Sequence, residues 1–305
     1  MTTFTITDCS TDSQLQDAIS HATDGDMITF ACSGTITLTS TLSIERKGRE
    51  AGRLMLGGIG QSVILDGGNK VRVLQVKGMH LALKGLTVAN GKTDESGGGL
   101  FMSQSSEVTI DNCTFSGNAA SHGGGLFNDG GKVTITNCTF FGNTASAWGG
   151  GLYNNFGGEA SISFSTFVNN TATIAGGLAN GYPPLRISAT IVANNIAKFR
   201  RQNCFDKVTS MGFNLESSAD CGFSNPQSHD QENIDPTLDP SGLQKNGGAT
   251  LTIALYVGSP AIGVVPIQMC PPTDQRGYLR PEGLSFCDIG AFQSSYLAPP
   301  TPPSP

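Results

Sequence analysis

The sequence predicts an all-β protein built as a parallel β-helix, and three observations support this fold class. Glycine accounts for 40 of the 305 residues and charged residues for only 14%, a composition typical of a turn-rich β protein. Apolar and polar residues alternate with period two inside the repeats, as they do in β-strands. Glycine runs followed by leucine recur every 26 residues, at Leu100, Leu126, Leu152 and Leu178. A unit this short buries its apolar side only by stacking on copies of itself, so equivalent residues become vertical neighbours.

The chain divides into an N-terminal cap, the coils of the β-helix, an irregular C-terminal part of the solenoid and a proline-rich tail, which correspond to residues 1–33, 34–202, 203–297 and 298–305. Inside the cap, Ser13 and Gln16 fit a capping box and an apolar stripe follows, which predicts one short helix near residues 13–23. This capping helix would cover the open strand edge at the start of the stack. The tail is a stiff spacer, typical of a domain that is attached to something else.

Two further columns follow from the repeat. Asparagine recurs at Asn118, Asn143, Asn170 and Asn195, in positions between strands, where its side chain bonds the neighbouring backbone. Threonine recurs in an outward column at Thr87, Thr114, Thr139 and Thr166. Regular threonine arrays order water in ice-binding solenoids, which makes ice binding a remote alternative function. The simpler interpretation is that threonine is a common residue of exposed strands.

The cysteines indicate an oxidising compartment. Their proximity along the chain favours three disulfides, Cys9–Cys32, Cys204–Cys221 and Cys270–Cys287. Cys113 and Cys138 occupy equivalent repeat positions and are expected to be small buried apolar residues. The chain opens without the basic start and apolar core of a secretory signal, so we expect a secreted or cell-surface protein whose signal has been removed.

Charge and hydropathy exclude two classes of protein. The net charge is −6, which argues against a nucleic-acid binder because such binding depends on neutralising phosphates. The longest apolar runs are only a few residues, which argues against a membrane span. We expect a monomer.

Three stretches resemble known families. Residues 9–38 with 65–68 resemble the start of right-handed parallel β-helix proteins of the pectate-lyase-like superfamily. The glycine-leucine repeats look like those of chlamydial polymorphic outer-membrane proteins. Residues 246–292 are similar to the choice-of-anchor Q segment of surface proteins, although Gly263 departs from the acidic residue often found there. The resemblance implies a right-handed β-helix, a polysaccharide as partner, a cell-surface anchor and, for a lyase, Ca²⁺ as cofactor. No cluster of acids matches such a calcium site, and we predict no metal site.

The columns bring together one candidate sugar-binding flank. His122 and Trp148 precede successive glycine runs, Glu95 lies close to the equivalent position one coil earlier, and Tyr153 follows a repeat leucine. An indole beside an imidazole and a carboxylate suits a pyranose ring and its hydroxyls. We therefore name Glu95 and His122 as candidate catalytic residues and Trp148 and Tyr153 as candidate substrate-binding residues. An inward-facing aromatic stack is the alternative, because alternation does not decide whether leucine or the aromatic residue points in.

Asp111 is the third candidate catalytic residue. It occupies an outward strand position adjacent to Thr136 and Lys84, where a solvated acid is the structural alternative. Arg186, Arg200 and Arg201 form a basic group that suits an anionic sugar, or else an ordinary solvated loop.

These features predict a protein that binds an extracellular polysaccharide. If it is an enzyme, we expect it to cleave that polysaccharide as a lyase or a glycoside hydrolase. The alternative is a non-catalytic adhesin-like or structural surface solenoid, which the proline spacer and the anchor-type ending favour. The two differ in one property, because an enzyme turns over a glycan and an adhesin only binds it.

Overall fold

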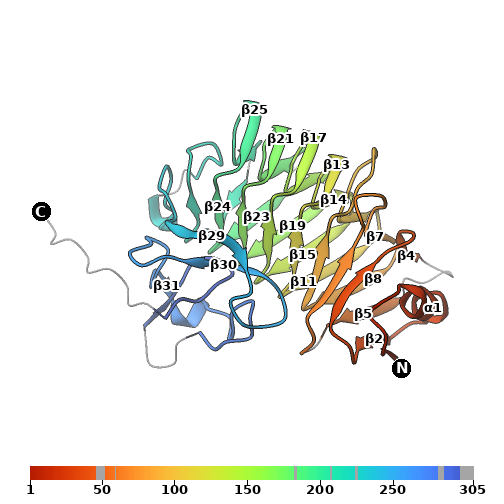
Figure 1. The fold of residues 1–305 in the computed structure, drawn as a ribbon. Helices are drawn as coiled ribbons and strands as arrows, with labels where there is room; N and C mark the ends of the chain where they lie inside the picture. The colour runs from red at the N-terminus through yellow and green to blue at the C-terminus, as the bar shows by residue number, and fades with distance from the viewer. Residues whose placement is uncertain are drawn as a thin grey trace, which may run out of the picture.

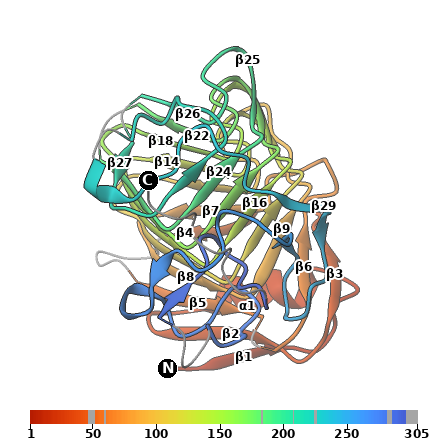
Figure 2. The same ribbon diagram turned by 90° about the vertical axis from the view of Figure 1, so that its left-hand side faces the viewer.

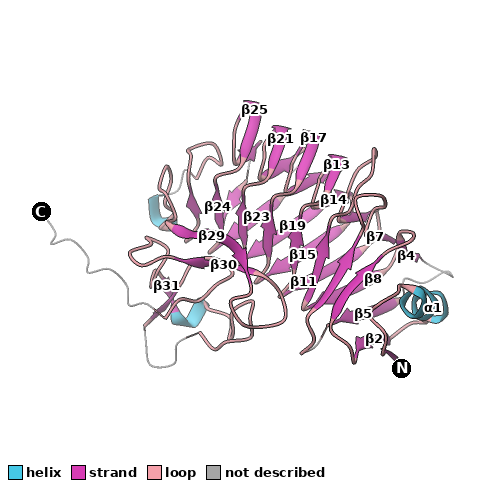
Figure 3. Ribbon diagram, viewed as in Figure 1, coloured by secondary structure: helices cyan, strands magenta, loops and turns pink. Residues whose placement is uncertain are grey.

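The computed structural model describes residues 1–45, 52–58, 60–181, 184–206, 208–223, 226–280 and 285–295. The chain winds into a β-solenoid whose strands run parallel and stack coil upon coil (Figures 1 and 3). One full coil consists of β10 (Leu100–Met102), β11 (Glu107–Asp111), β12 (Thr114–Ser116) and β13 (Ala119–His122), each of which pairs with its counterpart in the next coil. Figure 2 views the coils from the end where the C-terminal segment lies.

Four parallel sheets form the sides of the solenoid. Sheet A contains β1 (Thr3–Ile6), β2 (Asp26–Phe30), β5 (Arg53–Gly57), β8 (His80–Lys84), β11, β15 (Lys132–Thr136), β19 (Glu159–Ser163), β23 (Leu185–Ser188) and β27 (Thr209–Ser210). Sheet B contains β3 (Gly34–Thr37), β6 (Val63–Asp66), β9 (Leu86–Ala89), β12, β16 (Thr139–Phe141), β20 (Thr166–Val168), β24 (Ile191–Ala193) and β28 (Leu215–Glu216). Sheet C contains β4 (Leu42–Glu45), β7 (Leu74–Lys77), β10, β14 (Leu126–Asp129), β18 (Leu152–Asn155), β22 (Leu178–Asn180) and β26 (Cys204–Phe205). Sheet D contains β13, β17 (Thr144–Trp148), β21 (Thr171–Ile174) and β25 (Ile196–Arg200).

The repeat leucines become vertical neighbours, as the sequence predicts. Leu100 pairs with Leu126, Leu126 with Leu152, and Leu152 with Leu178, and all four lie in the apolar core. Three phenylalanines stack in the same core with ring centroids 4.7 and 4.4 Å apart: Phe115, Phe140 and Phe167. Cys113 and Cys138 are buried free thiols, as expected.

The asparagine column forms a buried hydrogen-bond ladder. The side-chain amide of each member donates to the Oδ1 of the next at 2.9 Å, in the order Asn118, Asn143, Asn170, Asn195 and Asn203. Each of the first four amides also donates to a backbone carbonyl of a sheet B strand in the preceding coil. The ladder therefore satisfies main-chain groups at the corner between sheets B and D.

The N-terminal end is closed by α1 (Ser13–His21), the one α-helix of the described residues. Its buried face, Leu15, Ala18 and Ile19, joins the solenoid core. The expected capping box does not form, because the N-cap is Asp12 and its carboxylate binds the backbone N–H and hydroxyl of Thr39 instead. Within the described residues, no helix is both long and apolar enough to cross a membrane.

Strands of the solenoid sheets also lie on both sides of residues 34–202. The cap residues already contribute β1 and β2 to sheet A, and the solenoid continues past residue 202 through β26, β27 and β28. The rest of the described chain contains two antiparallel pairs, β29 (Leu238–Gln244) with β30 (Thr252–Leu255) and β31 (Val265–Pro266) with β32 (Phe286–Cys287). It also contains two short 3₁₀ helices, η1 (Pro226–Ser228) and η2 (Ile267–Met269). Residues 298–305, the expected tail, lie outside the described part.

The C-terminal segment, defined here as residues 226–280 and 285–295, folds back on the solenoid (blue in Figure 1). It contacts the threonine column of sheet B. Thr114 donates to the carbonyl of Leu251 and Thr166 accepts from the N–H of Ala291. All four threonines are therefore at most 2% exposed. The column points out of the solenoid but is not exposed to solvent, because this segment covers it.

The three expected disulfides form: Cys9–Cys32, Cys204–Cys221 and Cys270–Cys287. Each disulfide lies within a single region: the first in the cap, the second at the last coil and the third in the C-terminal segment. Disulfides of this kind persist in oxidising surroundings, which supports an extracellular environment.

Candidate functional site

The outer face of sheet A carries three parallel columns of side chains, because alternate residues of each strand point away from the core. The middle column consists of small or flexible residues: Met27, Met55, Ala82, Thr109, Thr134 and Ser161. The column on one side is charged: Arg53, His80, Glu107, Lys132 and Glu159. The column on the other side contains Gly57, Lys84, Asp111, Thr136 and Ser163.

Three cavities meet on this face. The first, of about 390 Å³, is mostly apolar and shares Ala82 and Thr109 with the second, of about 450 Å³. The second shares Lys84, Asp111 and Asn112 with the third, of about 650 Å³. We call this continuous depression the trough. Its far wall is the C-terminal segment, through residues 271–273 beside the second cavity and residues 275–277 beside the third.

Asp111 is the acid at the centre of the trough. Its carboxyl group is half-buried, and burial raises its pKa, although the charge of Lys84 acts in the opposite direction. Lys84 is the neighbour of Asp111 in the preceding coil and is exposed. The adjacent Asn112 has φ +54° and a buried Oδ1 without a hydrogen-bond partner among the described residues. The site thus combines an acid with a raised pKa, a cation and a spare acceptor around one space.

The charged column contains a hydrogen-bonded relay that the sequence reasoning missed. Nδ1 of His80 lies 3.0 Å from one carboxylate oxygen of Glu107, and Nζ of Lys132 lies 2.9 Å from the other. The hydrogen bond from Lys132 lowers the pKa of Glu107. With Nδ1 engaged by a carboxylate, Nε2 is the ring nitrogen that remains for another contact. Placing each residue at its height in the repeat would have aligned His80, Glu107 and Lys132.

Glu95 lies outside the trough and is bound to another residue. Its carboxylate accepts from the guanidinium of Arg72 at 2.9 Å, and Arg72 is almost fully buried. Glu95 is therefore the counter-ion of a buried arginine, at the corner between sheets B and C. Glu95 does not line the trough, where Asp111 lies.

The predicted aromatic flank does gather, but it is largely covered. Ser96, His122 and Trp148 follow one another in neighbouring coils, and the His122 ring stacks on Tyr153 at 5.8 Å. Burial lowers the pKa of His122, and Tyr153 is only 7% exposed. The leucines point into the solenoid and the aromatic residues point outward, where Trp148 and Ile174, at the ends of sheet D strands, pack against them. This arrangement leaves no open ring face of Tyr153 for a sugar.

The basic group is dispersed. Arg186 is exposed on sheet A, beyond Ser161 in the middle column. Arg201 lies beside Phe205, with its guanidinium carbon 5.5 Å from the ring centre, at the far end of sheet C. The side chain of Arg200 lies outside the described part.

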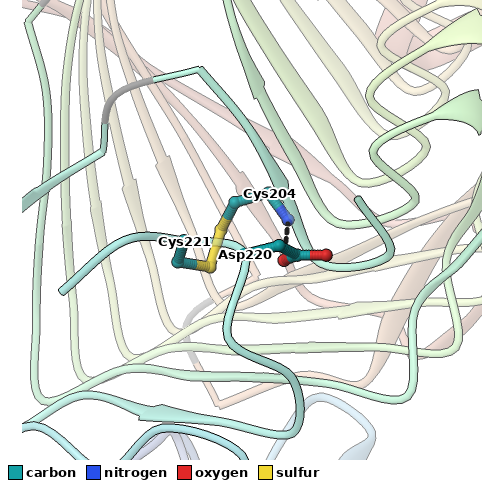
Figure 4. A group of neighbouring side chains, drawn as sticks. All are labelled: Cys204, Asp220 and Cys221. Carbon is teal, nitrogen blue, oxygen red and sulfur yellow. Dashed lines mark hydrogen bonds between the residues drawn. A yellow bond between two sulfur atoms is a disulfide. The ribbon is translucent and has the colours of Figure 1, made fainter. Parts of the chain in front are cut away.

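One group of side chains has the residue types of a metal site. Ligand atoms of Cys204, Asp220 and Cys221 lie within 4.8 Å of one another (Figure 4). The two sulfurs are bonded to each other, and Asp220 accepts a hydrogen bond from the backbone N–H of Cys204. A disulfide has no thiolate to offer a metal. Among the described trough residues, the second and third cavities contain one carboxylate, whereas Ca²⁺ takes six to eight oxygen ligands, so these residues do not fit a calcium ion.

Comparisons with known proteins agree with this architecture. The family described as "Right handed beta helix region" matches residues 59–228, more than half of the chain. No curated protein matches the sequence. Among solved structures, the crystal structure of pectate lyase Pel9A is similar in fold, with a TM-score of 0.51, 13% sequence identity and coverage of 96% of each chain. The stacked parallel coils and the family match lead to one conclusion: the chain belongs to the right-handed β-helix family.

Proposed function

We propose that the chain binds an extracellular polysaccharide in the trough and that Asp111 acts as a general acid in its cleavage. The observation that carries the proposal is the raised pKa of Asp111 in a cavity enclosed by sheet A and the C-terminal segment. A trough of stacked coils suits an extended polymer, because each coil repeats the surface of the one before it. The three disulfides support an extracellular location.

The chemistry favours elimination over hydrolysis. A glycoside hydrolase needs two carboxyl groups roughly 5 to 9.5 Å apart. Glu107 lies four residues from Asp111 on one strand, so their Cα atoms are about 13 Å apart at the usual rise of a strand. Asp111 is the one acid among the described residues lining the second and third cavities. In the elimination, a solvent water molecule in the trough would remove the C5 proton of the uronate, and the C4–C5 double bond would form as the C4–O bond breaks. Asp111 would donate its proton to the departing glycosidic oxygen and regain one from the solvent, while Lys84 contacts the carboxylate of the acidic sugar. The similarity in fold to a pectate lyase supports this substrate class.

The test is a panel of polysaccharides assayed for new reducing ends and for the ultraviolet absorbance of unsaturated uronates. We expect both signals for at least one acidic glycan with the wild-type protein, and their loss in Asp111→Asn with folding intact. Asp129→Asn is the matched control, since burial also raises the pKa of Asp129 but this residue ends strand β14 of sheet C and does not line the trough. Reducing ends without absorbance would show hydrolysis. Equal activity in Asp111→Asn would overturn the assignment of Asp111.

A non-catalytic surface solenoid remains the second candidate, favoured by the uncharged threonine and serine residues of the middle column beyond Ala82. It predicts glycan binding spread over several coils with no new reducing ends on any substrate. Residues 246–292, which resemble an anchor segment, pack against the solenoid in this structure. Gln275 and Arg280 are buried and bind the solenoid coils through Thr114 and Asn137. Attachment to a cell surface stays a proposal, tested by locating the protein in intact and protease-treated cells.

A further inference from the structure

A separate polar cavity, which is not part of the trough, lies at the corner between sheets B and C. It has a volume of about 440 Å³ and is built by three successive coils. Three of its lining residues are cations, Lys70, Arg72 and Lys92, in a protein whose net charge is −6. The lining contains one acid, Asp94. We propose that this cavity binds an oxyanion, the carboxylate or sulfate group of an acidic glycan.

The two lysines are available to a ligand. Lys70 and Lys92 are both exposed, and neither forms an ion pair within 4.0 Å among the described residues. Lys92 lies at the start of a column whose later members are neutral: Ala119, Thr144, Thr171 and Ile196. Among these five residues of the column, Lys92 is the one cation, and it is also the one that lines the cavity.

Arg72 forms the rigid floor of the cavity. Its guanidinium donates to Glu95, to the carbonyls of Ser96 and Gly97, and to Gln75. It also lies 5.2 Å from the ring centre of Phe101. With Glu95 neutralising Arg72, the lysines and Asp94 leave a net charge of about +1 to attract an anion.

The neutral lining residues supply further donors. Thr41, Asn69 and Thr93 line the same cavity. The hydroxyl oxygen of Thr93 accepts from the backbone N–H of Glu95, so its own hydrogen is available to a ligand. Ammonium, hydroxyl and amide donors around one space match an oxyanion, which accepts several hydrogen bonds at once.

The experiment measures the binding of inorganic sulfate, inorganic phosphate and monomeric glucuronate by calorimetry at low ionic strength, with glucose as a neutral control. We expect saturable binding of at least one oxyanion and none of glucose. The double variant Lys70→Gln/Lys92→Gln should bind at least about tenfold more weakly. The control Lys198→Gln/Lys245→Gln, which removes the same charge from exposed lysines elsewhere, should bind within about twofold of the wild type.

The choice of ligands and of the two double variants distinguishes the possible results. Preference for glucuronate indicates a carboxylate ligand, and preference for sulfate indicates a sulfated one. Absence of saturable binding by the wild-type protein would overturn the proposal, as would an equal loss in both double variants, which would indicate a general charge effect. Asp111→Asn should keep the anion binding, so failure of the trough as an active site leaves this result unchanged.

Discussion

The hydroxyl of Thr139 donates to Oε1 of Gln275 at 2.6 Å, although 136 positions separate the two residues. Through its amide, Gln275 also donates to the hydroxyls of Thr114 and Thr250 and to the carbonyl of Leu251. One buried side chain therefore joins two solenoid coils to the C-terminal segment, and the same contact places that segment over the trough.

Gln275→Ala should lower the free energy of unfolding by about 3 kcal/mol, because it leaves several buried polar groups unpaired. Chemical denaturation with urea measures this change. Gln244→Ala, which truncates an exposed glutamine of the same segment, should stay within about 0.5 kcal/mol of the wild type. A Gln275→Ala protein as stable as the control would show that the segment is held by other contacts.

Asn143→Ala should destabilise the solenoid by about 3 kcal/mol. The side chain donates to the carbonyl of Phe115 and to Asn170 and accepts two hydrogen bonds from Asn118. Thr144→Ala, which changes an exposed neighbour in the same coil, should cost far less. Similar unfolding midpoints for the two variants would contradict a stabilising role for the asparagine ladder.

Glu216 should make the protein less stable as the pH rises from about 4.5 to about 8. Burial, and then the hydrogen bond with Asp220, raise the pKa of Glu216 from 4.5 to about 8. In that window the folded state retains a proton that the unfolded chain has lost, so the stability is complete below pH 4.5 and is lost as the pH passes 8. Urea midpoints measured across this range give the slope.

Glu216→Gln should remove this fall, because glutamine resembles the protonated carboxyl group. Glu159→Gln, at an exposed position, should keep the wild-type pH profile. Parallel profiles for the wild type and Glu216→Gln would show that Glu216 is ionised in the fold.

Trp148→Ala should reduce stability by about 2 kcal/mol and leave glycan binding unchanged. The indole packs against Tyr153 and Phe205, with ring centres 5.7 and 4.9 Å away. Unfolding curves and a binding titration with the glycan that the wild type recognises separate the two effects. Lost binding in a folded Trp148→Ala protein would return the binding site to the aromatic flank.

Periodicity made much of the fold predictable. The 26-residue spacing of Leu100, Leu126 and Leu152 implied vertical stacking, and their strand register shows it. The repeat also aligned Asp111 with Lys84, because residues at one height of neighbouring parallel coils lie side by side. Alternation could not decide whether leucines or aromatic residues point inward, since it describes two faces without saying which is covered.

The sequence by itself determined what is local or periodic: the stacked coils, the asparagine ladder, the paired cysteines and the neighbours of Asp111. Only the tertiary structure decided that the C-terminal segment covers Thr114 and Thr139 and encloses the trough. That contact joins residues more than 100 positions apart and occurs only once among the described residues, so the repeat pattern of the sequence does not predict it. It arises because buried hydroxyls and carbonyls of two distant segments satisfy each other's hydrogen bonds, a match that becomes visible only when both are folded.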